Sequence, residues 1–144
     1  MKKMKRWSKA PELIIDPSPE IKISELISEY ASDYIDMGES TEQRQRYLNG
    51  ACTAWNIANL DETGREKAIR LVIEDFKRTN PAPGGAESLE RDLRKLVQKK
   101  LEMFPNIKKI IVDASIEPIS EREYKINIGS TYNKELVKRF SKRV

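Results

Sequence analysis

Apolar residues recur every three or four positions in the first half of the chain, which is the spacing of amphipathic helices. The first such stretch begins at Ile23 and ends near Gly38, a typical helix-terminating residue. The second begins at Ser40, which is followed by Gln43 at the spacing of a capping box. It extends to about Leu60, so two helices are predicted in this part of the sequence.

Two further helices are predicted by the same reasoning. Thr63 and Glu66 repeat the capping-box spacing and predict the start of a third helix, which should end at Asn80 before a proline. A Pro-Gly-Gly loop leads to the fourth helix, which ends at Pro105. Acidic residues near its start and basic residues near its end, Lys99 and Lys100, complement the helix dipole.

Alternating apolar and polar residues then predict a β-hairpin near the C-terminus. The pairing that keeps the apolar side chains on one face is Ile116 with Tyr124, Ala114 with Ile126, and Val112 with Ile128. An isolated hairpin is marginal in water, so a third strand is expected at an edge. Leu13-Ile14-Ile15 is one candidate, and a second copy of the protein is the alternative. A short closing helix is predicted from the apolar positions Tyr132, Leu136, Val137 and Phe140.

These elements predict an α+β fold of about four helices packed on a C-terminal antiparallel hairpin. The 144 residues are a usual length for one domain. We assign residues 1–10 to a basic tail and residues 11–144 to a single domain. No apolar run is long enough to span a bilayer, and the first residues lack the apolar segment of a signal peptide. We therefore expect a cytoplasmic protein that does not contact membranes.

The composition excludes several kinds of catalytic site. The chain has no histidine and one cysteine, so histidine acid/base catalysis and Cys/His zinc sites are impossible. Cys52 lies on the apolar face of the second helix with no basic neighbour there to activate it. No cofactor or metal is expected, and an enzyme is the less favoured interpretation.

The positive charge is concentrated at the two ends of the sequence. The formal net charge is +4, but the residues between the ends are acidic on balance. Flexible basic ends are able to track phosphates, so a nucleic-acid-associated role is one hypothesis. The basic residues concerned are Lys2, Lys3, Lys5, Arg6, Lys9, Lys138, Arg139, Lys142 and Arg143.

One pattern has a superficial resemblance to the metal-dependent PD-(D/E)xK nucleases, which hold Mg²⁺ between carboxylates beside a lysine. Its residues are Asp113, Glu123 and Lys125. In the predicted register Asp113 faces Asn127 while Glu123 faces Glu117, so the two acids of the motif lie roughly 13 Å apart. They would not share a metal ion, and a solvated hairpin face is the favoured interpretation. The Glu117–Glu123 pair would repel, which favours a wider turn that separates the two.

Three functional hypotheses remain. The leading one is a non-enzymatic interaction protein whose helical surface or hairpin edge binds either another chain or a second copy of itself. The alternatives are a nucleic-acid-associated accessory protein that uses its basic ends and, less favoured, a carboxylate-metal phosphodiesterase centred on Asp113, Glu123 and Lys125.

Overall fold

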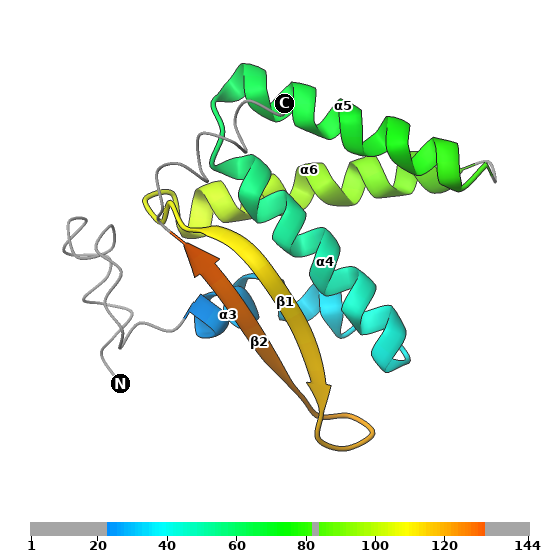
Figure 1. Ribbon diagram of the computed structural model, residues 1–144, viewed down its shortest axis with the longest axis vertical. Helices are drawn as coiled ribbons and strands as arrows, with labels where there is room; N and C mark the ends of the chain where they lie inside the picture. Colours follow the sequence, from blue (N-terminus) through cyan, green and yellow to red (C-terminus); the bar gives the residue numbers. More distant parts are fainter. Residues whose placement is uncertain (1–22, 82–83, 132–144) are drawn as a thin grey trace.

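The computed structural model describes residues 23–81 and 84–131 and confirms the predicted α+β fold (Figure 1). Four helices pack with a C-terminal antiparallel hairpin. The elements are α3 (Ile23–Ile35), α4 (Thr41–Ala58), α5 (Glu62–Thr79), α6 (Gly85–Met103), β1 (Ile110–Pro118) and β2 (Tyr124–Thr131).

Helix α4 is the centre of the molecule, because α3, α6 and β1 all pack against it (Figure 1). Its Trp55 is fully buried and meets the ring of Tyr30 edge-on, with the ring centroids 5.3 Å apart. The Tyr30 hydroxyl donates to the backbone oxygen of Ala51 at 3.0 Å, so this buried polar group has a partner. The predicted assignment of Cys52 to the core is confirmed, since its side chain is buried here.

The two predicted capping boxes have different outcomes. Ser40 does cap α4, accepting from the Gln43 N–H at 3.1 Å, while the Gln43 side chain bonds to the backbone N–H of residue 39. The prediction for α5 was wrong, because Asp61 rather than Thr63 is its N-cap. The Asp61 carboxylate accepts from the Gly64 N–H at 2.7 Å, so the helix starts earlier than predicted. Glu66 is thereby free to reach another helix.

The register of the hairpin differs from the predicted one by two residues. Ile116 pairs with Ile126, Ala114 with Ile128, and Pro118 with Tyr124. The turn is displaced along the chain and is no wider than predicted: residues 119–123 follow the Pro118–Tyr124 pair, and the N–H groups of residues 119 and 120 both donate to the backbone oxygen of residue 123. A shift of two keeps every side chain on its original face, so the apolar residues still point toward the helices.

A β-bulge also corrects the predicted position of Val112. The register shifts between Ile111 and Asp113, where Val112 is the extra residue. Ile110 and Ile111 are therefore both buried, whereas the Val112 side chain is 59% exposed. Simple alternation, which placed Val112 on the apolar face, is interrupted at this point.

Several sequence predictions fall outside the described residues. The proposed third strand at residues 13–15 and the closing helix beyond residue 131 are among them, as is the basic tail at residues 1–10. They stay predictions, as does the assignment of residues 11–144 to one domain. No helix within the described ranges is both long and apolar enough to cross a membrane.

Candidate functional site

The three residues of the nuclease-like pattern lie apart in the structure. Asp113 pairs with Gly129, and Lys125 pairs with Glu117. Glu123 belongs to the turn before β2, six residues from the partner of Asp113, which corresponds to roughly 20 Å along the strand. Within residues 23–81 and 84–131, no group of three or more His, Cys, Asp or Glu side chains could hold a metal ion. The geometry does not assemble the site that the pattern suggested.

The like-charge pair of the predicted register is also absent from this hairpin. Glu117 lies opposite Lys125 and accepts a hydrogen bond of 3.1 Å from the Asn127 side chain. Glu123 caps the turn with Ser120 instead. The shift in register, and not the wider turn that we favoured, therefore separates the two glutamates.

The remaining candidates from the sequence are the basic residues of the two ends and the thiol of Cys52. The basic residues of both ends lie outside the described residues, so their role in nucleic-acid binding stays a prediction. Burial raises the pKa of the Cys52 thiol to about 12. A thiol with so high a pKa is a poor nucleophile at neutral pH.

A buried lysine is the polar feature that sequence reasoning missed. Lys100 has no exposed surface, and its Nζ donates to Asn59 Oδ1 at 2.9 Å and to the Ile107 oxygen at 2.7 Å. The same Nζ lies 4.9 Å from the centroid of the Trp55 ring. Burial, with a smaller contribution from Lys108, lowers the pKa of Lys100 to about 7. Lys100 is inaccessible to solvent, and its hydrogen bond to Ile107 links α6 to the segment before β1.

The signal for this burial was present in the sequence. Leu93, Leu96 and Val97 are buried along one face of α6, and Lys100 occupies the same three- and four-residue spacing. Because a lysine near the C-terminal end of a helix is explained by the helix dipole, the sequence analysis did not identify Lys100 as a buried residue.

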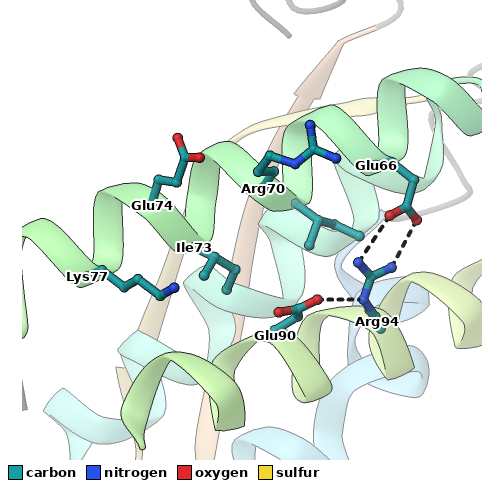
Figure 2. A pocket seen from close by; sticks show the side chains of 8 residues that line it. Glu66, Arg70, Ile73, Glu74, Lys77, Glu90 and Arg94 are labelled. Atoms are coloured by element: carbon teal, nitrogen blue, oxygen red, sulfur yellow. Dashed lines mark hydrogen bonds and ion pairs between the residues drawn. The ribbon is translucent and has the colours of Figure 1, made fainter. Parts of the chain in front are cut away.

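A pocket of about 350 Å³ lies between α5 and α6 (Figure 2). Ile69 and Ile73 contribute its apolar lining. Arg94 of α6 forms an ion pair with Glu66 of α5 at 2.9 Å, which bridges the helices, and another with Glu90 of its own helix at 3.0 Å. Three acidic and three basic side chains line the pocket, so their charges balance. This arrangement explains how α5 is held on α6 without calling for a ligand.

The outer edge of β1 is closed by amide side chains of α4. Gln45 acts as a neighbouring strand would: its Oε1 accepts from the Ile116 N–H at 2.8 Å, and its Nε2 donates to the Ala114 oxygen at 3.0 Å. Asn56 does the same for Ile111, with 2.8 Å to the N–H and 3.0 Å to the oxygen. These bonds satisfy backbone groups that would otherwise be available to another strand.

The same closure extends beyond the start of β1. The Trp55 indole N–H and the Asn59 amide both donate to the Lys109 oxygen, at 2.9 Å and 3.1 Å. Side chains of α4 and its C-cap residue Asn59 thus occupy backbone groups from Lys109 to Ile116, which hinders the addition of another strand at this edge.

The edge of β2 is the opposite case. Because Ile116 and Ala114 direct their backbone groups at α4, their antiparallel partners Ile126 and Ile128 direct theirs away from β1. Among residues 23–81 and 84–131, no backbone or side-chain group forms a hydrogen bond with these outward groups of Ile126 and Ile128. Within this part of the chain, the hairpin therefore has one closed and one open edge.

A groove of about 550 Å³ runs between this open edge and α3, which packs beside β2 (Figure 1). The α3 side presents a row of hydroxyls, those of Ser24, Ser28 and Ser32. On the β2 side, the groove is lined by Lys125 and Ile126. We call this the β2–α3 groove; its lining is completed by Glu25, Glu29 and Tyr124.

The groove has a fixed end and an acidic wall. At the start of β2 the Tyr124 hydroxyl donates to Asp36, and the Arg44 guanidinium lies 5.5 Å from the Tyr124 ring centroid. Helix α3 carries three acidic residues and no basic one. The groove combines free backbone hydrogen-bonding groups with an acidic helix.

Comparison of the chain with protein-family models, with curated proteins and with solved structures finds no match.

Proposed function

We propose that the protein is a non-enzymatic interaction module that binds an extended polypeptide segment in the β2–α3 groove. The observation that carries this proposal is the difference between the two edges of the hairpin. One edge is closed by Gln45 and Asn56 of α4, whereas the other presents the backbone of Ile126 and Ile128 beside a groove.

Addition of a strand to an open sheet edge is a common way of recognising peptides. Backbone hydrogen bonds supply the affinity, and the flanking surface supplies the specificity. Here a bound segment would pair with Ile126 and Ile128 on one side and meet the hydroxyls of Ser24, Ser28 and Ser32 on the other. Such a contact would also relieve the marginal stability of a two-stranded sheet.

The charge of the groove favours one class of partner. The α3 wall is acidic, with Glu25 and Glu29 at the groove itself. A segment with basic residues beside its extended part would be attracted to this wall, whereas an acidic segment would be repelled. A second copy pairing edge to edge would bring two acidic α3 helices together, so we favour a different kind of segment.

The proposal is tested by selecting ligands from a library of random 12-residue peptides with the full chain as bait. A selected peptide is then labelled, and its affinity is measured by fluorescence anisotropy. Backbone amide exchange, followed by NMR, reports the site of binding. We expect the amides of Ile126 and Ile128 to exchange at least tenfold more slowly when the peptide is bound, because they become hydrogen-bonded.

Two matched variants separate groove binding from binding elsewhere. Ser28→Trp fills the groove from its exposed α3 wall and should weaken binding at least tenfold. Ser88→Trp makes the same change at an exposed position of α6 and should leave the affinity unchanged. Equal affinity for both variants, or unchanged exchange at Ile126 and Ile128, would show that the groove is not the binding site.

A further inference from the structure

The two faces of a strand added to the open edge of β2 would meet different charges. Side chains that lie directly opposite each other in neighbouring strands share one face of the sheet. On β2, Ile126 is buried on the face toward the helices, whereas the adjacent Lys125 is exposed on the other face. Successive residues of an added strand would therefore lie alternately on the face of Ile126, toward α3, and on the face of Lys125, toward solvent.

The helix-side face of such a strand would meet acidic side chains. In Figure 1 the blue start of α3 extends past the edge of β2 that faces away from β1, on the helix side of the place that an added strand would occupy. Glu25 and Glu29 line the groove there, and both are exposed. Within residues 23–81 and 84–131, neither of them forms an ion pair. The groove thus offers two uncompensated carboxylates to the helix-side residues of a bound segment.

The shape of the groove suits a long cationic side chain on this face. The serines that line the α3 side are short, so they leave open a groove of about 550 Å³. A lysine or arginine placed opposite Ile126 would pack its hydrocarbon stem on that residue and extend its charged end to Glu25 or Glu29. A basic residue makes both contacts, whereas an acidic or a short residue does not.

The solvent-side face disfavours the same charge. Lys125 lines the groove from β2, and within the described ranges it forms no ion pair, although Glu117 lies opposite it on β1. Like charges directly opposite each other in a sheet repel, so a basic residue beside Lys125 would weaken binding. The positions of basic residues along a segment, and not only their number, therefore decide how well it fits.

We propose that the β2–α3 groove binds extended segments whose basic residues occupy alternate positions, all on the helix-side face, with uncharged or acidic residues between them. This inference rests on the proposed peptide-binding function and specifies its partner. A second copy pairing edge to edge does not meet the requirement, because its β2 would place Tyr124, Ile126 and Ile128 on that face. The partner is therefore a different chain with an alternating basic pattern.

Two isomeric peptides test this pattern with the full chain. Val-Thr-Lys-Thr-Lys-Thr-Val places both lysines on one face of a strand, whereas Val-Thr-Thr-Lys-Lys-Thr-Val places them on opposite faces. Their composition and net charge are the same, so attraction that ignores position gives them equal affinity. We expect the alternating peptide to bind the wild type at least fivefold more tightly in fluorescence anisotropy at low ionic strength, where screening is weak.

Protein variants identify the residues that select the pattern. Glu25→Gln combined with Glu29→Gln should reduce the preference to less than twofold. Glu74→Gln combined with Glu102→Gln makes the same change at exposed positions of α5 and α6 and should keep the preference. Lys125→Gln should reduce it by at least half, because the repulsion on the solvent side is removed. Circular dichroism and thermal melting establish that each variant is folded.

The outcomes separate this inference from the function on which it rests. Equal affinities of the two peptides for the wild type would overturn the inference, as would a preference that survives Glu25→Gln with Glu29→Gln. If neither peptide binds, the peptides selected from the random library decide. Groove-bound peptides with the alternating basic pattern support the inference, and groove-bound peptides without it overturn the inference but leave the proposed function in place. Absence of any groove-specific peptide removes the proposed function, and the inference with it.

Discussion

The Oε1 of Gln45 accepts a hydrogen bond of 2.8 Å from the backbone N–H of Ile116, although the two residues are 71 positions apart in the sequence. A glutamine on a helix thus takes the place of a neighbouring strand. The Nε2 of the same side chain donates to the Ala114 oxygen, so one amide satisfies two backbone groups of β1. Closing one edge in this way leaves the other edge as the place where the sheet can grow.

Replacement of this glutamine should destabilise the fold. Gln45→Ala leaves the partly buried N–H of Ile116 and oxygen of Ala114 without partners, at an expected cost of about 1–3 kcal/mol in the free energy of unfolding. Urea unfolding followed by tryptophan fluorescence measures this change. Gln98→Ala removes an exposed glutamine that bonds only to Glu102 and should change the stability by less than about 0.5 kcal/mol. Equal effects of the two substitutions would contradict the edge-closing role.

Lys100 should make the stability depend on pH in an unusual direction. Its pKa is about 7 in the folded protein and near 10.5 when exposed, so the unfolded chain binds more protons between these values. Stability should therefore rise as the pH increases above about 7, by up to roughly 1.4 kcal/mol per pH unit. Below pH 7 both states are protonated, and this contribution no longer changes.

The comparison with Lys100→Met isolates this effect. The variant should lose the rise in stability between pH 7 and 8.5, whereas Lys95→Met, at an exposed position of the same helix, should keep it. The measurements stop at pH 8.5 because Cys52 acts in the opposite direction at higher pH. Its thiol has a raised pKa in the folded protein, so it loses its proton in the unfolded chain at a lower pH than in the folded one, and this lowers the free energy of unfolding. A parallel pH profile for wild type and Lys100→Met would refute the prediction.

Two glycines should respond to alanine in opposite directions. Gly50 lies within α4, and a Cβ there would be in ordinary contact with the Tyr34 ring at 3.9 Å. Gly50→Ala should stabilise the protein by about 0.5–1 kcal/mol, because glycine weakens a helix interior. Gly84 has a φ of 89°, so Gly84→Ala should cost about 1–2 kcal/mol although nothing lies within 4 Å. Thermal melting of both variants tests the opposite signs.

Cys52 should be almost unreactive toward thiol reagents in the native protein. Its side chain is buried and its pKa is raised to about 12, so very little thiolate exists at pH 8. Labelling with 5,5′-dithiobis(2-nitrobenzoic acid) should be slow in buffer and fast in 6 M guanidinium chloride. Gly50→Ala, if it stabilises the fold, should slow the native reaction further. Rapid labelling of the folded protein would show that this part of the core opens easily.

Local patterns predicted most of the elements but not all of their details. The cap at Ser40 was identified because the box lies within four residues, and the apolar stripes of α3 and α4 follow from helical spacing alone. The start of α5 was placed two residues late, since Asp61 and Thr63 are both good caps and only the folded chain selects between them. The hairpin register was two residues off because the position of its turn has a weak local signal, and the bulge at Val112 shifts the register again toward the start of β1.

What the sequence determined by itself is the class of the fold and the apolar faces of its helices, since both follow from the two- and 3.6-residue periods of short segments. Absence of histidine and a single cysteine likewise settled which catalytic chemistries are impossible. Tertiary structure decided the rest: the burial of Lys100, the partners of Arg94, and the closure of β1 by Gln45 and Asn56. Each of these depends on groups distant in sequence meeting in space, so no local pattern could show that the edge of β2 is the open one.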